Sequence, residues 1–153
     1  MDLSGKITLE VGIQVPAAKF FEVFTKQLHN VKDICGRVQG AKLHEGDDVW
    51  HNHDSVKQWT CVVGGKATTY KERIEVIDEE NKLVRFKVFD DDINEHYKDL
   101  KISLQVSEKN DELGSVKWTI EYEKINDEVE APYGFVELLD ISTKDVILHL
   151  LKA

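Results

Sequence analysis

The sequence has few cysteines and few prolines, and both shortages exclude classes of protein. Its 153 residues include only two of each. Cys35 and Cys61 match no metal-binding or redox spacing, so we expect two small buried side chains and no disulfide. With 41% hydrophobic and 32% charged residues, the composition excludes a disordered or fibrous chain. The length predicts one globular domain over residues 1–153.

Basic charge is also in short supply. The chain has 29 acidic and 20 basic residues, for a formal net charge of −9. Such a charge repels phosphate backbones and anionic lipid, and the lysines alternate singly with other residues instead of clustering. We therefore expect neither nucleic acid nor a membrane surface as a partner.

Long apolar runs are absent as well. The N-terminal segment MDLSGKITLE lacks the features of a secretory signal, and no later stretch has the length of a membrane-spanning helix. These absences predict a cytoplasmic protein without stable membrane insertion.

Several segments alternate apolar and polar residues, as half-buried strands do. The clearest is 116–122, where Val116, Trp118, Ile120 and Tyr122 share one face. A Gly64-Gly65 hairpin turn is expected between two strands, and Gly40 suggests a bulge in another. The predicted strands are 6–15, 37–44, 56–63, 66–77, 84–88, 100–106 and 116–122.

Helical spacing appears in three places. Phe20, Phe21, Val23 and Phe24 predict a short helix that begins with Pro16 as its first residue and ends near residue 28. A second short helix is expected over 29–34, and the longest runs from about Pro132 almost to the C-terminus. The polar segments 45–54 and 78–82 and the acidic tip 90–94 are interpreted as loops or turns.

The order of these elements predicts an α+β domain. Strands joined by short turns pair antiparallel, so a seven-stranded sheet is expected to carry its helices on one face. A sheet this wide must curl, and a single long helix cannot fill its concave side. The residues alone leave open whether a cavity remains there or the apolar side chains simply pack together.

The side chains expected to line such a cavity follow from alternation and helical spacing. Most are apolar, and His29, Arg73, Tyr122 and Ser142 are the main polar exceptions. The predicted ligand-binding residues are Phe24, His29, Val31, Trp59, Cys61, Thr69, Arg73, Val84, Phe86, Val88, Leu100, Ile102, Trp118, Ile120, Tyr122, Phe135, Leu138, Leu139, Ser142 and Val146.

No catalytic or metal motif is evident. The segment HNHD (51–54) could place two imidazoles and a carboxylate on a metal, but a solvated loop is the favoured interpretation. Acid–base catalysis needs two titratable groups within reach of one substrate, and no spacing here demonstrates that. Neither a phosphate-binding loop, a nucleophile elbow nor a zinc-protease helix is present. We expect no metal, cofactor or catalytic residue.

Three segments carry a resemblance to a known family. PAAKFFEVF, GKATTYKERIEVIDEENKLVRFKVF and KWTIEYEK resemble, in order, the major latex proteins, plant members of the birch-pollen-allergen (Bet v I) superfamily. The resemblance covers essentially the whole chain. It implies a helix-grip fold, similar to that of START lipid-transfer domains, with a cavity between the sheet and the C-terminal helix.

The resemblance also implies a function. Relatives bind plant hormones, flavonoids, alkaloids, sterol-like molecules or hydrophobic pollutants, and many are linked to defence and stress. The expected activity is therefore binding and carriage of a hydrophobic small molecule by a monomer or weak dimer. The alternative is an enzyme of plant specialised metabolism that condenses, cyclises or isomerises a substrate in the same cavity. A module without ligand, its cavity filled by Trp59 and Trp118, also stays open.

Two departures from the family pattern stand out. Relatives carry a glycine-rich loop where this chain has HEGDDVWHNHDSV, so a phosphate-cradling role for the loop is not expected. Arg73 occupies a position that is often apolar in relatives. If its strand phase points it inward, it could meet a ligand carboxylate.

Overall fold

The computed structural model describes residues 2–45, 50–51 and 55–152. Seven strands form one antiparallel sheet in the order β1-β7-β6-β5-β4-β3-β2. The strands are β1 (Ser4–Ile13), β2 (Val38–Glu45), β3 (Val56–Val63), β4 (Lys66–Asp78), β5 (Leu83–Phe89), β6 (Tyr97–Glu108) and β7 (Gly114–Lys124).

The helices lie at three places along the chain. A short pair with a single 3₁₀ turn between them follows β1, one turn precedes β6, and the longest ends the chain. They are α1 (Ala17–Lys26), the 3₁₀ turn η1 (Leu28–Asn30), α2 (Val31–Ile34), α3 (Asp91–Asn94) and α4 (Tyr133–Lys152). The predicted α+β architecture is confirmed.

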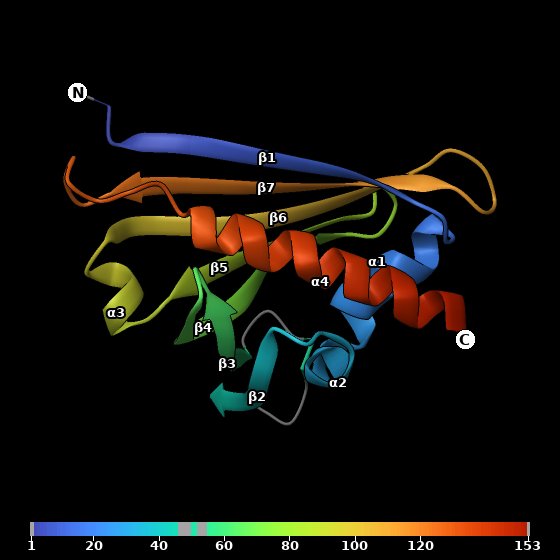
Figure 1. Ribbon diagram of the computed structural model, residues 1–153, viewed down its shortest axis with the longest axis horizontal. Helices are drawn as coiled ribbons and strands as arrows, with labels where there is room; N and C mark the ends of the chain where they lie inside the picture. Colours follow the sequence, from blue (N-terminus) through green and yellow to red (C-terminus); the bar gives the residue numbers. More distant parts are fainter. Residues whose placement is uncertain (1, 46–49, 52–54, 153) are drawn as a thin grey trace.

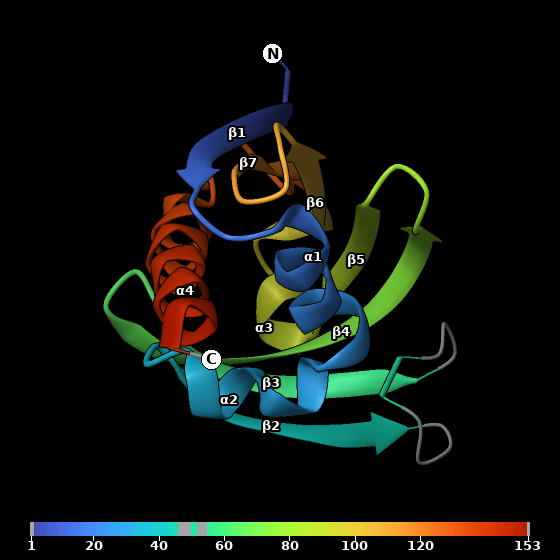
Figure 2. The same ribbon diagram turned by 90° about the vertical axis from the view of Figure 1, so that its right-hand side faces the viewer.

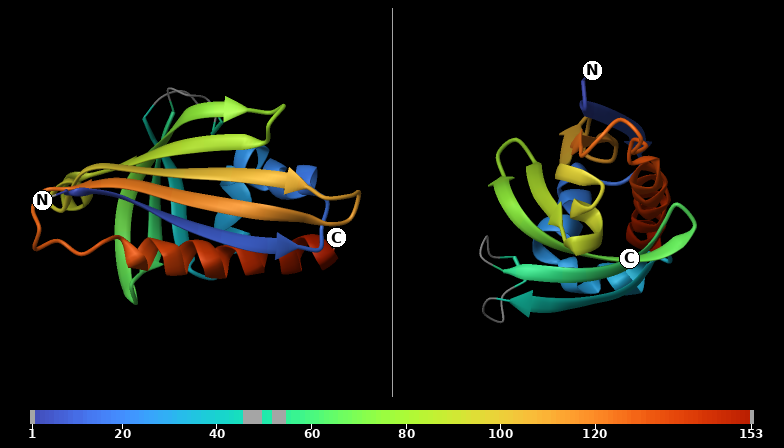
Figure 3. Two further views of the ribbon diagram at one scale, coloured as in Figure 1. Left: turned by 90° about the horizontal axis from the view of Figure 1, so that it is seen from above. Right: turned by 90° about the vertical axis from the view of Figure 1, so that its left-hand side faces the viewer.

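The sheet curls around its helices. In Figure 1, α4 runs along the concave side below β1, β7 and β6, while β2 and β3 cross beneath it. Viewed from the end in Figure 2, the strands pass from β1 at the top to β2 at the bottom with α1, α3 and α4 between them. Figure 3 shows α4 beside β1 over most of its length. This curvature follows from strand twist accumulating across a wide sheet.

A two-residue turn joins β3 to β4 and sets their register. Gly64 and Gly65 have φ of +60° and +78°, values that side-chain-bearing residues rarely adopt. Val63 therefore pairs with Lys66. The turn also touches the start of α4, because a Cβ added to Gly134 would lie 2.7 Å from the Gly64 nitrogen.

Buried hydrogen bonds fasten α4 inside the sheet. Trp118 Nε1 of β7 donates to Thr143 Oγ1 at 2.8 Å, and that hydroxyl donates to the Leu139 carbonyl at 2.7 Å. An exposed hydrogen bond joins α4 to the segment between α2 and β2, where the Gly36 amide donates to Asp145 Oδ2 at 3.0 Å. These hydrogen bonds fix the position of α4 relative to β7 and to the segment between α2 and β2.

Most predicted elements are confirmed, with shifts at their ends. The bulge near Gly40 is present, as a register shift between Val38 and Gly40 in the pairing of β2 with β3. β1 ends at Ile13, not at residue 15, and Pro16 is the N-cap of α1, not its first residue. The acidic tip predicted as a turn contains the helical turn α3, which begins where Asp90 accepts a hydrogen bond from the Asp91 amide.

Candidate functional site

A cavity of about 60 Å³ lies between the concave face of the sheet and helices α1, α2 and α4. Its wall is almost entirely apolar, and Glu72 is its one charged lining residue within the described part of the chain. The wall consists of Phe24, Leu28, Val31, Val38, Trp59, Cys61, Tyr70, Glu72, Phe86, Ile102, Trp118, Leu138, Leu139 and Ser142.

The volume of this cavity limits what enters without rearrangement. Pockets for drug-sized ligands usually measure about 300–1,000 Å³, whereas one ordered water needs only about 10–15 Å³. Both large tryptophans, Trp59 and Trp118, belong to the wall of this cavity. A ligand larger than a single small ring therefore requires lining side chains to move.

Polar groups gather at the end of the cavity formed by β3 and β4. The inward face of β3 carries Lys57, Trp59 and Cys61, and that of β4 carries Tyr70 and Glu72. Lys57 pairs with Glu72 across the ladder, and Trp59 pairs with Tyr70. Two ionisable side chains thus sit opposite each other beneath the apolar wall.

Burial dominates the electrostatics of this pair. Lys57 is 0% exposed and Glu72 is 8% exposed. Burial raises the pKa of Glu72 to about 7, although the charge of Lys57 and, more weakly, the Trp59 indole oppose the rise. Burial likewise lowers the pKa of Lys57, and the Glu72 charge opposes that change. The ammonium group donates to the Ser55 carbonyl at 3.4 Å.

The two tryptophans of the wall differ in the state of their indole N–H. That of Trp118 is satisfied by Thr143. Trp59 Nε1 is buried and makes no hydrogen bond among the described residues, although the indole lies near enough to the Glu72 carboxyl to lower the pKa of that group slightly. A buried donor without an acceptor is unusual and calls for an explanation.

The cysteines are free and inert in their folded surroundings. Burial raises the pKa of Cys35 to about 12 and that of Cys61 to about 11. Cys61 Sγ shares a 3.5 Å hydrogen bond with Tyr70 Oη, whose own pKa is raised well above its usual value by burial. Neither thiol is therefore a candidate nucleophile at neutral pH.

Aromatic rings meet where η1 faces the β2–β3 connection. The Leu28 amide donates to His51 Nε2 at 3.0 Å, so this imidazole is neutral. Its pKa is lowered by burial, then by the charges of His29 and Lys57. The Trp50 ring stands between those of His29 and Trp59, at centroid distances of 6.3 and 6.4 Å. Trp59 is the member of this cluster that lines the cavity.

The predicted loop site falls mostly outside the described part of the chain. Of the HNHD segment, only His51 is described, and residues 52–54 lie outside. In the described residues there is no group of three or more His, Cys, Asp or Glu side chains that could hold a metal ion.

The structure divides the predicted ligand-binding residues into three groups. The first lines the cavity: Phe24, Val31, Trp59, Cys61, Phe86, Ile102, Trp118, Leu138, Leu139 and Ser142. The second is buried in the core beside it: Val84, Val88, Leu100, Ile120, Phe135 and Val146. Tyr122 is half-buried, with its ring over Gly5 of β1 and against Tyr97.

The third group faces away from the cavity. His29 is exposed, and Thr69 shares a 3.2 Å hydrogen bond with Thr60 on the outer face of the sheet. The Arg73 side chain is 45% exposed and pairs with Glu75 at 4.0 Å. The inward placement considered for Arg73 is therefore wrong.

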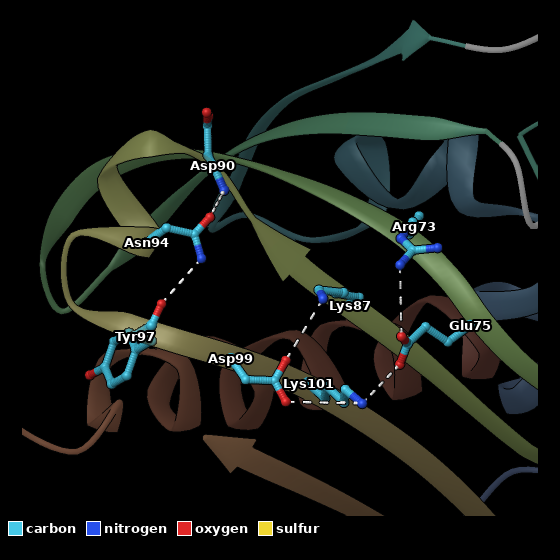
Figure 4. A network of polar contacts seen from close by, with 8 residues as sticks. All are labelled: Arg73, Glu75, Lys87, Asp90, Asn94, Tyr97, Asp99 and Lys101. Atoms are coloured by element: carbon cyan, nitrogen blue, oxygen red, sulfur yellow. Dashed lines mark hydrogen bonds and ion pairs between the residues drawn. The ribbon is translucent and has the colours of Figure 1, made fainter. Parts of the chain in front are cut away.

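Arg73 belongs instead to an ion-pair network on the outer face of β4, β5 and β6 (Figure 4). Lys101 connects Glu75, at 3.6 Å, to Asp99, at 4.0 Å, and Asp99 also pairs with Lys87 at 4.0 Å. Exposed pairs of this kind contribute only about 0–1 kcal/mol each. The network is a solvated surface of the sheet.

Sequence reasoning missed Leu28, Val38, Tyr70 and Glu72 of the wall and Lys57 behind it. The sequence does contain a signal that Tyr70 and Glu72 of β4 face inward. A two-residue turn at Gly64-Gly65 pairs residue 63 with 66, which places 70 and 72, not 69 and 73, on the face that carries Trp59 and Cys61.

Comparison with known proteins agrees with this architecture. Residues 2–153 match the model of the "Pathogenesis-related protein Bet v 1 family". MLP-like protein 43 of Arabidopsis thaliana is 39% identical over 151 residues, which cover 97% of this chain and 94% of that protein. The crystal structure of ginseng major latex-like protein 151 from Panax ginseng superposes with a TM-score of 0.89 at 36% identity, covering 97% and 99% of the two chains.

A more distant likeness is limited to the fold. Norcoclaurine synthase from Thalictrum flavum, in complex with dopamine and hydroxybenzaldehyde, superposes with a TM-score of 0.72 at 17% identity, covering 95% of this chain and 88% of that one.

The curved sheet gripping a long helix over an apolar cavity defines a helix-grip protein. With the family match and the similarity to major latex proteins, the chain belongs to the Bet v 1 family. No helix in the described residues has both the length and the apolar character needed to cross a membrane.

Proposed function

We propose that this chain, acting as one domain, binds and carries a hydrophobic small molecule in the cavity between α4 and the sheet. The observation that supports the proposal most directly is the apolar wall, interrupted by a carboxyl group and by an indole N–H that has no partner among the described residues. Small-molecule sites typically combine such a wall with a few polar groups that orient the ligand. The ligand class we propose includes plant hormones, flavonoids, alkaloids and sterol-like or other lipids.

We place this binding in the cytoplasm of a plant cell, in a defence or stress response. Both cysteines are free and buried, as is usual in a reducing compartment. The similar proteins come from Arabidopsis thaliana and Panax ginseng and belong to the family described as pathogenesis-related.

A fluorescent apolar probe tests the proposal. N-phenyl-1-naphthylamine should become fluorescent on binding, and a cavity-filling Val38→Phe substitution should weaken its binding at least about tenfold, because Val38 lines the wall. The matched control is Val76→Phe, at a position that is 37% exposed. Equal binding by the two variants, or none by the wild type, would contradict a ligand site in this cavity.

Catalysis in the same cavity is the second candidate, and the Glu72 carboxyl favours it. A pKa of about 7 suits a group that accepts and returns a proton near neutral pH. Lys57 lies opposite but does not line the cavity. Turnover of a carbonyl-containing plant metabolite that is lost in Glu72→Gln, while N-phenyl-1-naphthylamine still binds, would favour the enzyme over the carrier.

A further inference from the structure

The polar end of the cavity contains a hydrogen-bond donor without an acceptor beside a carboxyl group. Trp59 is 4% exposed, and its Nε1 has no partner among the described residues. The Glu72 side chain lines the same cavity and is 8% exposed. A bound molecule that gives Trp59 Nε1 an acceptor removes an unfavourable feature of the empty cavity.

Pairing in the sheet brings these two groups to one place. Trp59 pairs with Tyr70 and Lys57 pairs with Glu72, so Trp59 and Glu72 are diagonal neighbours on the inward face of β3 and β4. Long side chains at diagonal positions reach each other across adjacent strands. A single ligand atom between them can therefore contact both.

Neighbouring polar groups are already occupied. Trp118 Nε1 donates to Thr143, and Tyr70 Oη shares a hydrogen bond with Cys61 Sγ. The Lys57 ammonium donates to the Ser55 carbonyl behind the wall. On the inward face of β3 and β4, Trp59 Nε1 and the Glu72 carboxyl thus remain as the pair that a ligand can use.

We propose that this pair selects apolar ligands that carry one hydroxyl group, an alcohol or a phenol. The hydroxyl oxygen accepts from Trp59 Nε1, and its proton is donated to a Glu72 carboxylate oxygen. The inference rests on the proposed function, since it names the chemical class of ligand for the same cavity.

Other head groups satisfy the pair less well. A hydrocarbon leaves Trp59 Nε1 without an acceptor, and an ether has no proton for Glu72. A ligand carboxylate brings a second negative charge against Glu72, while an ammonium group has no lone pair for the indole. The hydroxyl also suits the protonated form of Glu72, because its oxygen has two lone pairs and can accept from both neighbours.

Four compounds built on one ring separate these possibilities: toluene, p-cresol, 4-methylanisole and 4-methylbenzoate. Each is titrated against bound N-phenyl-1-naphthylamine at about pH 8.5, where Glu72 is ionised. We expect p-cresol to bind at least about tenfold tighter than toluene and 4-methylanisole, and 4-methylbenzoate to bind most weakly.

Variants test whether Trp59 and Glu72 cause the preference for p-cresol over toluene. Trp59→Phe and Glu72→Met should each reduce the preference for p-cresol over toluene to less than about threefold while toluene still binds. The matched control is Tyr133→Phe, which removes a polar group from an aromatic side chain that is 66% exposed and does not line the cavity, and it should keep the preference. Lys57→Met/Glu72→Met serves if the single Glu72 variant fails to fold.

Failure of the hydroxyl site and failure of the proposed hydrophobic carrier give different results. Equal binding of p-cresol and toluene by the wild type, or a preference that survives both Trp59→Phe and Glu72→Met, overturns the hydroxyl site but leaves the hydrophobic carrier intact. Failure of N-phenyl-1-naphthylamine and all four compounds to bind overturns the proposed function and the inference together.

Discussion

Lys57 and Glu72 are the buried charged side chains among the described residues. Both are removed from water, and moving an ionised group out of water costs several kcal/mol unless a partner compensates it. They stand opposite each other across the β3–β4 ladder, and each opposes the pKa shift that burial imposes on the other. Neutralising one of them alone should therefore cost more than replacing both.

Lys57→Met should lower the free energy of unfolding by about 3 kcal/mol, because it leaves the Glu72 carboxyl buried beside an apolar side chain. The double variant Lys57→Met/Glu72→Leu should come within about 1 kcal/mol of the wild type or exceed it. Urea unfolding at about pH 8 measures both. Additive losses in the double variant would mean that the two groups do not compensate each other.

The raised pKa of Glu72 predicts a pH dependence of stability. Its pKa is about 7 in the folded chain, against an ordinary value of 4.5, so between these values the folded state holds a proton that the unfolded state has lost. The stability contributed by this group should fall by about 3 kcal/mol as pH rises through that interval. The stability of the wild type relative to Glu72→Gln, from urea unfolding, should decrease over this range. A difference in stability between the two proteins that stays constant over this range would contradict the prediction.

The cysteines should resist modification while the chain is folded. Burial raises the pKa of Cys35 to about 12 and that of Cys61 to about 11, so little thiolate exists at about pH 8. We expect the native chain to react with a disulfide reagent such as Ellman's reagent at least about a hundredfold more slowly than the chain in denaturant. Rapid reaction of one thiol in the native chain would show that the cavity opens to water often.

Between elements, the main chain of the β3–β4 turn lies close against the start of α4. A Cβ at Gly134 would lie 2.7 Å from the Gly64 nitrogen and 2.9 Å from Val63 Cγ1. Backbone atoms cannot yield as a flexible side chain does, so the turn and the helix would have to separate.

Gly134→Ala should therefore lower the free energy of unfolding by about 1–3 kcal/mol, although alanine favours helix. The matched control is Gly12→Ala, where an added Cβ has no neighbour within 4 Å, and we expect no loss there. Chemical denaturation followed by circular dichroism compares the two. A Gly134→Ala variant as stable as Gly12→Ala would show that the turn can move away from the helix without cost.

Across the whole molecule, the cavity couples ligand to stability, because its wall is drawn from α1, α2, α4 and most strands of the sheet. A ligand that binds only the folded chain stabilises it by about 2.7 kcal/mol at a hundred times its Kd. N-phenyl-1-naphthylamine should raise the melting temperature of the wild type and of Val76→Phe, and have little effect on Val38→Phe. The same rise in all three would place the probe outside the cavity.

How far the sequence predicts this protein differs from element to element. The alternation of Val116, Trp118, Ile120 and Tyr122 was enough for β7, and the apolar stripe was enough for α4, because both patterns are local. The phase of β4 was not predicted correctly, since KATTYKERIEVID places polar residues on both of its faces. Arg73 and Thr69 were accordingly expected inside, where the structure has Tyr70 and Glu72.

The sequence by itself determined the antiparallel sheet, its long final helix and the apolar nature of the space between them, because periodicity and turn residues act over a few positions. Only the tertiary structure decided which polar groups enter that space. Lys57, Trp59 and Glu72 become neighbours through the pairing of β3 with β4. Trp118 finds an acceptor on α4, while Trp59 finds none in the part of the chain that the structure describes, because the satisfaction of a buried N–H depends on what packs against it.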